Sequence, residues 1–198
     1  TEIKNNFKIT PKQLEKEINH KTKAFLFSSP CNPTGSVYSK KELYEIAMIF
    51  KKHKNIVIIS DEIYEHINFT NNHFSIGSIE EVKDQVVTIN GLSKGFAMTG
   101  WRFGYLAACE KIAAACNKMQ GQITSATSSI TQRAAITALA EAPLCTEKMR
   151  NTFKQRRNLM IRNLREIKDL EINSPEGAFY IFPNISKYIN KSYKNYVI

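Results

Sequence analysis

The sequence predicts an α/β fold in which helices cover both faces of a mainly parallel sheet. Four short runs are apolar almost throughout and are spaced as strands, at residues 24–28, 56–60, 86–90 and 103–108. Continuous apolar runs are typical of strands buried on both faces, as the strands of parallel sheets are. Helical patterns alternate in part with these runs, and this alternation favours a three-layer α/β domain.

The first three runs each end where chemically capable polar residues begin. Asn32 follows the first run, Asp61 the second, and the pair Ser93 and Lys94 the third. In open α/β sheets, ligands bind beyond the carboxyl ends of the strands. Three independent candidates at this location therefore predict a shared site at the carboxyl edge of the sheet.

The helical segments are indicated by caps and by apolar periodicity. Ser39 and Glu42 have the spacing of a capping box, and the apolar residues that follow predict a helix through about His53. Residues 111–140 have a helical pattern rich in Ala, Ser and Thr, which Pro143 interrupts.

The composition and charge of the chain indicate which classes of binding partner it has. Of the 198 residues, 42% are hydrophobic and 10% aromatic, which is typical of a globular protein with a sizeable core. The formal net charge is +10, but the basic residues are spread along the chain and no nucleic-acid-binding motif accompanies them. We therefore expect no nucleic-acid partner. No apolar run approaches the roughly 18 residues of a membrane-spanning helix, so we expect no membrane partner.

The four cysteines, Cys31, Cys109, Cys116 and Cys145, show neither CxxC pairs nor the dense spacing of a disulfide scaffold. The sequence therefore predicts no metal site and no disulfide framework. A reducing, cytoplasmic location fits this use of cysteine best.

Lys94 lies in the most informative stretch, residues 93–102. A lysine amine acts as a nucleophile and base when burial and neighbouring positive charge draw its pKa down. Ser93 and Arg102 are suited to a phosphate, because Arg binds phosphate bidentately and a hydroxyl adds one more donor. Pyridoxal phosphate (PLP) requires a Schiff-base lysine and an anionic partner for its ring nitrogen, and Asp61 is suited to be that partner.

Four ordered motifs, within residues 32–35, 61–64, 93–105 and 175–183, resemble the class I aminotransferases of the fold-type-I PLP enzymes. The amino-acid sequences of the last two motifs, residues 93–105 and 175–183, are most similar to the branch of the family that contains bacterial aspartate and aromatic aminotransferases. The resemblance implies a PLP cofactor and a homodimer. It also implies transfer of an amino group from an L-amino acid, with aspartate favoured, to a 2-oxo acid such as 2-oxoglutarate.

The resemblance further implies a role for each candidate residue. Lys94 forms an imine with the cofactor and, once freed, moves a proton from the substrate α-carbon. The carboxylate of Asp61 pairs with the pyridine nitrogen. Four further residues bind the cofactor, namely Asn32 and Tyr64 at its phenolic oxygen and Ser93 and Arg102 at its phosphate. The Asn32-Pro33 bond is a candidate for a cis peptide.

In the resembled family a long helix connects the cofactor-binding domain to a small domain. A charged helix is predicted here from about Thr146 to Ile167, and residues 178–182 are predicted as the first strand of the small domain. We therefore expect residues 1–145 to be part of the large, PLP-binding domain of the fold-type-I architecture. Residues 146–198 are then the linker helix and the beginning of a small α+β domain.

Family members are longer than this chain, so we expect it to be an internal fragment. The phosphate-binding glycine loop, the aromatic ring that stacks on the pyridine and the arginine for the substrate carboxylate are expected outside it. Two alternatives stay open: another PLP reaction on the same fold, such as that of a carbon–sulfur lyase, or a non-catalytic, aminotransferase-like regulator domain. The amino-acid sequence of residues 97–102 favours transamination over these alternatives.

Overall fold

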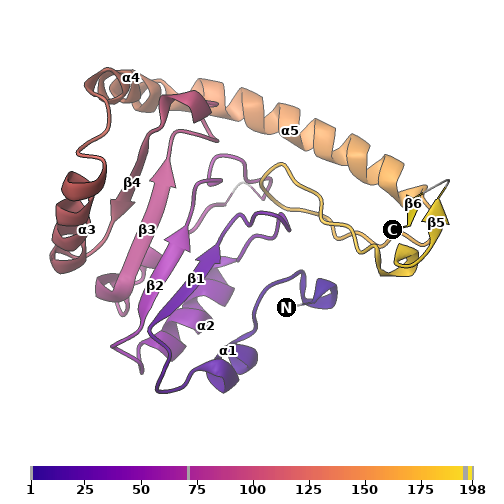
Figure 1. Ribbon diagram of the computed structural model, residues 1–198, viewed down its shortest axis with the longest axis horizontal. Helices are drawn as coiled ribbons and strands as arrows, with labels where there is room; N and C mark the ends of the chain where they lie inside the picture. Colours follow the sequence, from indigo (N-terminus) through magenta and orange to yellow (C-terminus); the bar gives the residue numbers. More distant parts are fainter. Residues whose placement is uncertain (1, 71, 194–195, 198) are drawn as a thin grey trace.

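A four-stranded sheet forms the centre of the computed structural model, which describes residues 2–70, 72–193 and 196–197 (Figure 1). The strands lie in the order β1 (Ala24–Ser28), β2 (Val57–Asp61), β3 (Val86–Gly91) and β4 (Gly104–Ala107). The first three strands run parallel and β4 runs antiparallel to β3. The mainly parallel sheet predicted from the apolar runs is therefore confirmed.

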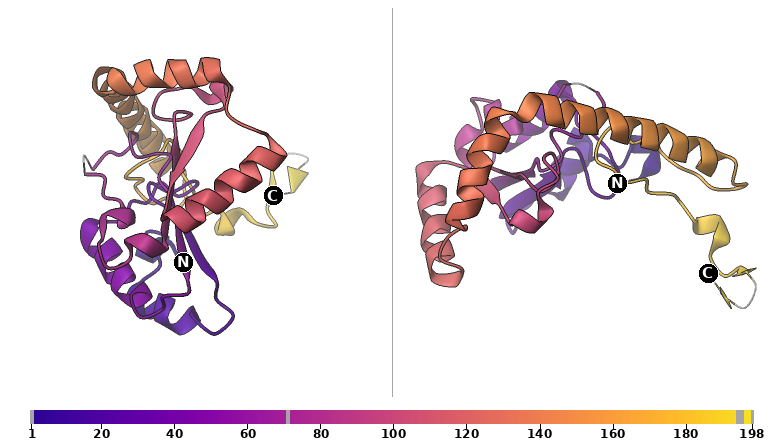
Figure 2. Two further views of the ribbon diagram at one scale, coloured as in Figure 1. Left: turned by 90° about the vertical axis from the view of Figure 1, so that its left-hand side faces the viewer. Right: turned by 90° about the horizontal axis from the view of Figure 1, so that it is seen from above.

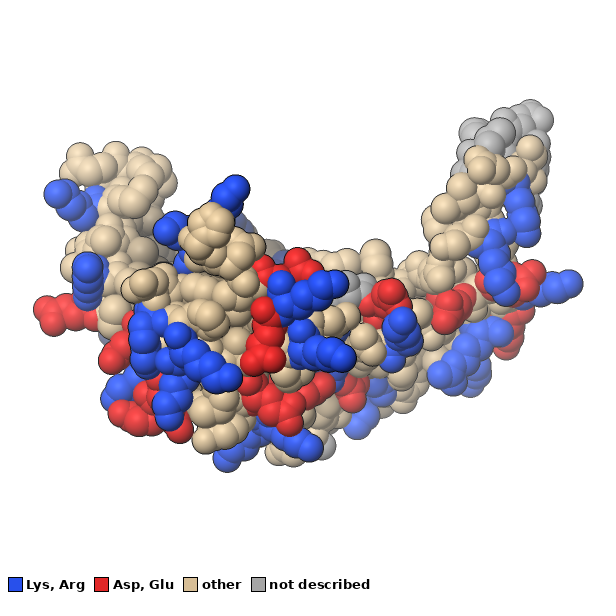
Figure 3. Space-filling view, turned by 90° about the horizontal axis from the view of Figure 1, so that it is seen from below, with Lys and Arg blue, Asp and Glu red and all other residues tan. Residues whose placement is uncertain are grey.

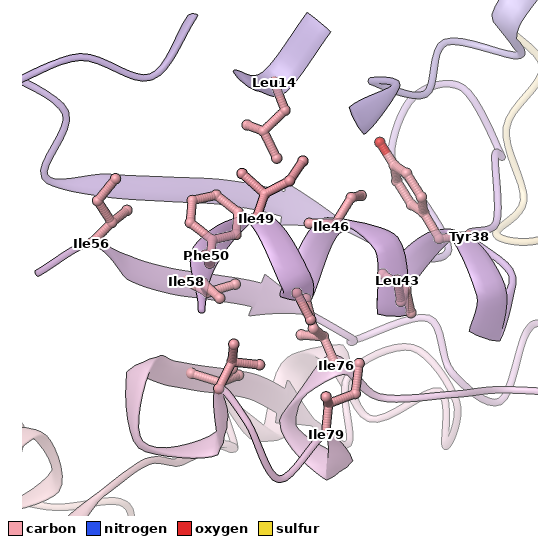
Figure 4. Close-up of a cluster of buried hydrophobic side chains, with 13 residues drawn as sticks. Leu14, Tyr38, Leu43, Ile46, Ile49, Phe50, Ile56, Ile58, Ile76 and Ile79 are labelled. Carbon is pink, nitrogen blue, oxygen red and sulfur yellow. The ribbon is translucent and has the colours of Figure 1, made fainter. Parts of the chain in front are cut away.

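Helices α1 (Pro11–Glu17) and α2 (Lys40–Phe50) cover one face of this sheet. Ile46 and Phe50 of α2 belong, with Ile58 of β2, to one cluster of fully buried side chains (Figure 4). On the opposite face Leu26 is 69% exposed in the described part of the chain. Leu26 pairs with Ile59 in the parallel register, which places both on the face away from Ile58.

The predicted capping box starts α2. The Ser39 hydroxyl accepts from the Glu42 backbone N–H at 3.3 Å, and the Glu42 carboxylate accepts from the Ser39 backbone N–H at 2.7 Å. Two of the otherwise unpaired N–H groups of the first turn are satisfied in this way. The helix ends at Phe50, slightly before the predicted end at about His53.

The helical stretch predicted at residues 111–140 is two helices, α3 (Glu110–Ile123) and α4 (Ser129–Ala140). The break between them is rich in hydroxyl side chains, and Ser125 has a φ of +65°. Such side chains compete with the helix for backbone hydrogen bonds, which explains why the helical pattern does not continue across them.

Helix α5 (Ala142–Arg165) begins earlier than the predicted Thr146. Pro143 lies in its first turn, where the missing N–H would have no helical partner in any case. Proline therefore starts this helix instead of interrupting one. Helix α5 runs across the carboxyl ends of β1 to β3, as two directions of view show (Figures 1 and 2).

The prediction of a strand at residues 178–182 is wrong, because the structure has no strand there. A strand exists only as part of a ladder, and in the described residues this segment has no neighbouring strand; an isolated bridge joins Asn68 to Gly177 just before it. Ala178 has a φ of +56°, which is not an extended conformation. The remaining elements are short: η1 (Ile3–Asn5), η2 (Ile76–Ser78), η3 (Lys83–Gln85), η4 (Thr99–Trp101), η5 (Ser186–Tyr188), β5 (Ser192–Tyr193) and β6 (Tyr196–Val197).

Backbone hydrogen bonds fasten the 176–178 segment to two loops at the carboxyl edge of the sheet. The N–H groups of Glu176 and Gly177 donate to the carbonyl of Gly35 at 2.8 and 2.9 Å, and Ala178 N–H donates to the carbonyl of Ile67 at 2.8 Å. Gly35 has a φ of +68°, and an added Cβ would lie 2.2 Å from Cβ of Pro175. Only glycine fits this contact.

We expect Gly35→Ala to destabilise the full-length protein by about 2–5 kcal/mol. The left-handed conformation and the collision with Pro175 both oppose the methyl group. Gly121 is the matched control, because it lies inside α3 and an added Cβ would meet no atom within 4 Å. Gly121→Ala should therefore stabilise by about 0.5–1 kcal/mol. Thermal unfolding of both variants tests this, and equal midpoints would contradict the close approach.

Basic side chains do not gather into one patch on the face shown in Figure 3. Lys and Arg are interspersed there with Asp and Glu, in line with the spread of charge along the sequence. In the part of the chain that the structure describes, none of the helices has the length and apolar character needed to cross a membrane.

Candidate active site

Lys94 lies three residues beyond the end of β3, in the turn that connects this strand to η4. Its side chain is half-buried, and its Nζ lies 5.8 Å from the centre of the Phe179 ring. Within the described residues the amine makes no hydrogen bond and no ion pair at the distances that define them. It is therefore free for covalent chemistry.

A cavity of about 450 Å³ opens beside Lys94. Its polar and charged lining comes from the Lys94 turn and from α5: Ser93, Lys94, Thr99, Lys148, Thr152 and Arg156. Three of these side chains are cationic, and no Asp or Glu is among the lining residues. Clustered positive charge in a concave site attracts anions, so the cavity is suited to a phosphate or a carboxylate.

Asp61 ends β2, and its position follows from the register of the sheet. It pairs with Ser28 at the end of β1 and with Ile89 of β3. Its Oδ1 accepts a hydrogen bond from the Ile63 backbone N–H at 3.1 Å, which fixes the carboxylate at the strand end. The carboxylate lies close enough to Tyr64 to affect the pKa of that residue.

Tyr64 and Asn32 meet at a third side chain, that of Tyr180. The hydroxyls of Tyr64 and Tyr180 lie 2.6 Å apart, and Asn32 Nδ2 donates to Tyr180 Oη at 3.3 Å. Burial raises the pKa of Tyr64, and Tyr180 and Asp61 raise it further. The turn that carries Asn32 contains two cis peptides, Ser29-Pro30 and Asn32-Pro33.

The two predicted phosphate ligands lie in adjoining cavities. Ser93 lines the cavity of Lys94, whereas Arg102 lines a neighbouring cavity of about 870 Å³. Ala97 lines both, so the two cavities are next to each other. Arg102 is exposed, has a φ of +53°, and donates from Nη1 to the carbonyl of Thr99 at 2.7 Å. The structure thus brings Ser93 and Lys94 together and places Arg102 beside them.

Sequence reasoning missed Tyr180, Lys148 and Arg156. Nothing in the spacing connects Tyr180 to Tyr64, because their contact depends on the hydrogen bonds that fasten the 176–178 segment. Lys148 and Arg156 belong to a long basic helix on which no single residue stands out in the sequence. The adjacent Phe179 also lies here, and its ring contacts Lys94 and, at 5.3 Å between ring centres, Tyr64.

Glu62 is next to Asp61 in sequence but belongs to a separate polar network. Its carboxylate accepts from the hydroxyls of Ser60 at 2.9 Å and Ser75 at 2.7 Å, and lies 2.8 Å from His73 Nε2. Glu62 is 3% exposed, so these bonds offset the cost of burying its charge. The network joins β2 to the segment before η2 and is structural.

The sequence model of the family Aminotransferase class I and II matches residues 1–196. The chain belongs to this family. The resemblance inferred from the four motifs is thereby confirmed.

Similar curated proteins come from plants and bacteria. The chain is 44% identical over 192 residues to a bifunctional aspartate aminotransferase and glutamate/aspartate-prephenate aminotransferase of Petunia hybrida, covering 95% of this chain and 40% of that protein. It is 40% identical to an aspartate/prephenate aminotransferase of Cereibacter sphaeroides, covering 96% of this chain and 48% of that protein. The chain spans less than half the length of these two relatives.

Solved structures share the fold. An aromatic aminotransferase from Pyrococcus horikoshii OT3 superposes with a TM-score of 0.90 at 39% identity, covering 95% of this chain and 50% of that one. An aspartate aminotransferase from Rhizobium meliloti gives a TM-score of 0.90 at 32% identity, covering 96% and 48%. The predicted fold class is therefore confirmed.

Proposed function

We propose that the full-length protein is a PLP-dependent aminotransferase that transfers an amino group from an L-amino acid to a 2-oxo acid. The observation that carries the proposal is the position of Lys94. Its amine is unpaired within the described residues and faces a cationic cavity at the carboxyl edge of the sheet. Asp61, Tyr64 and Asn32 lie at the same edge. Membership of the aminotransferase family supports the same reading.

The chemistry of these residues fits PLP. The cofactor needs an amine for its aldehyde, an anion for its ring nitrogen, donors for its phenolic oxygen and cations or donors for its phosphate. Lys94 and Asp61 would supply the first two, and Tyr64 and Asn32 the third. Ser93 lies beside Lys94 for the phosphate, and Arg102 lines the adjoining cavity. When bound, PLP supplies an electron sink that stabilises the negative charge left when the substrate loses its α-proton.

The residues of this chain would bind, orient and move a proton. Lys94, once released from the cofactor, would take the proton from the substrate α-carbon, which requires an amine that is not held by another group. Asp61 would hold a proton on the ring nitrogen, and its backbone contact to Ile63 keeps it oriented for this role. Tyr64 is 3% exposed and has a raised pKa, so it stays protonated and can donate a hydrogen bond.

Aspartate is the amino donor that we propose, with 2-oxoglutarate as an acceptor. The support is the aspartate named for the Petunia hybrida and Cereibacter sphaeroides relatives. The cations Lys148 and Arg156 beside Lys94 suit a substrate with a second carboxylate. We also propose a cytoplasmic homodimer, in which residues 1–145 belong to the PLP-binding domain and residues 146–198 contain the linker helix and the start of the small domain.

Chemical labelling tests the proposal. We expect the full-length protein with PLP to be reduced by borohydride to a stable secondary amine, and peptide mapping to place that label on Lys94. The reason is that only an unpaired amine facing the cofactor site forms the Schiff base. A label on a different lysine, or none, would refute the assignment.

A further inference from the structure

Tyr180 occupies a position that no predicted role explains. Its hydroxyl is the point at which Asn32 Nδ2 and Tyr64 Oη converge, at 3.3 and 2.6 Å. These are the two side chains assigned above to the phenolic oxygen of the cofactor. Tyr180 thus contacts both members of that pair.

The position of Tyr180 is set by its backbone and by aromatic contacts. Two residues earlier, Ala178 N–H donates to the carbonyl of Ile67. The ring of Tyr180 meets that of Tyr64 edge-on at 5.8 Å and that of Phe179 at 4.8 Å, measured between ring centres. Edge-to-face packing of the kind that Tyr180 makes with Tyr64 is a preferred geometry for aromatic rings. The phenol is therefore fixed relative to Tyr64.

The hydrogen bonds among Asn32, Tyr180 and Tyr64 have a single direction once Tyr64 donates to a further acceptor. A tyrosine hydroxyl has one proton to donate and can also accept. The oxygen of Tyr180 accepts from the amide of Asn32, and either hydroxyl can be the donor between Tyr180 and Tyr64. When Tyr64 donates its proton to another acceptor, such as the phenolic oxygen of bound PLP, Tyr180 must be the donor across the 2.6 Å contact. In that state the order of donation is Asn32 to Tyr180 to Tyr64, and Tyr64 donates to the added acceptor.

Linked hydrogen bonds of this kind strengthen one another, particularly where water is excluded. Tyr64 is buried, and its raised pKa keeps it protonated. A hydrogen bond received from Tyr180 polarises the Tyr64 hydroxyl and makes it a stronger donor to the next oxygen.

We propose that Tyr180 is a positioning residue that strengthens the hydrogen bond from Tyr64 to the phenolic oxygen of PLP. The inference rests on the proposed function. With PLP bound, a proton on the Lys94 linkage would be stabilised by that same oxygen, and a strong donor at Tyr64 would compete for it. This competition would disfavour the protonated form and so lower the pKa of the Lys94 linkage.

The test is a pH titration of the visible absorbance of PLP bound to the full-length protein. We expect Tyr180→Phe to raise the pKa of the Lys94 linkage by about 0.5–1 unit, which corresponds to the loss of one hydrogen bond. Phenylalanine keeps the ring contacts, so the fold is expected to persist. In a Tyr64→Phe background the same substitution should produce no further shift, because the donor on which it acts is absent.

Tyr44→Phe is the matched control. Tyr44 is exposed on α2, and its hydroxyl donates to Glu81 at 3.4 Å, so its loss should leave the titration unchanged. An unshifted titration in Tyr180→Phe would overturn the inference, even if the melting temperature fell. A shift that persists at full size in the Tyr64→Phe background would also overturn it. A protein that forms no Lys94 linkage with PLP would instead refute the proposed function.

Discussion

Lys94→Ala should lower the turnover number of the full-length protein by about 10⁴-fold or more. In the proposed mechanism, the substitution removes the amine that would bind the cofactor covalently and the base that would move the α-proton. Acid–base catalysis alone contributes about 10²–10⁴-fold. A 10⁴-fold loss corresponds to about 5.4 kcal/mol of transition-state stabilisation. The measurement is amino-group transfer from aspartate to 2-oxoglutarate at saturating substrate.

Lys94→Arg separates the amine chemistry from the charge. Arginine keeps the positive charge of the cavity but stays protonated and is a poor nucleophile. We therefore expect it to be nearly as inactive as Lys94→Ala. Lys118 on α3 is exposed and does not line the cavity of Lys94, so Lys118→Ala should retain full turnover. Activity of Lys94→Arg within tenfold of the unmodified protein would show that the amine is not essential.

The elements that could be predicted from sequence are those whose stability is local or whose residues are apolar almost throughout. Strands β1 to β3 consist largely of apolar residues, although Leu26 of β1 is exposed in the described part of the chain. The Ser39 capping box is a local hydrogen-bond pattern, so the residues indicate both features directly. The strand predicted at residues 178–182 could not be judged in this way. Its aromatic and apolar residues suit a strand, but whether a ladder forms depends on a partner elsewhere in the chain.

In the candidate site, too, some residues can be found from local sequence and others depend on contacts with distant parts of the chain. Lys94 and Asp61 follow buried strands of a parallel sheet, so the rule that ligands bind beyond strand ends predicts their common location. Tyr180 could not be found by this rule. Its contact with Tyr64 depends on the close approach of Gly35 and Pro175 and on the left-handed turn at Ala178, which no local pattern encodes.

Asp61→Asn should keep the fold and the bound cofactor but lose about 10²-fold or more in turnover, roughly 3 kcal/mol. Asparagine retains an oxygen that can accept the Ile63 N–H, so the local structure at the end of β2 is preserved. It lacks the negative charge that would keep the ring nitrogen protonated, and the ring becomes a weaker electron sink. Turnover and cofactor absorbance, measured on the same sample, separate loss of chemistry from loss of PLP.

Asp84→Asn provides the matched removal of a carboxylate, because Asp84 is exposed in η3, away from the site. It should leave turnover unchanged, which excludes a general effect of net charge. If Asp61→Asn turned over at nearly the unmodified rate with PLP bound, the ring nitrogen would have another partner. If instead it lost the cofactor, Asp61 would act chiefly in binding. Retained cofactor with lost turnover is the combination that places the Asp61 charge in the chemical step.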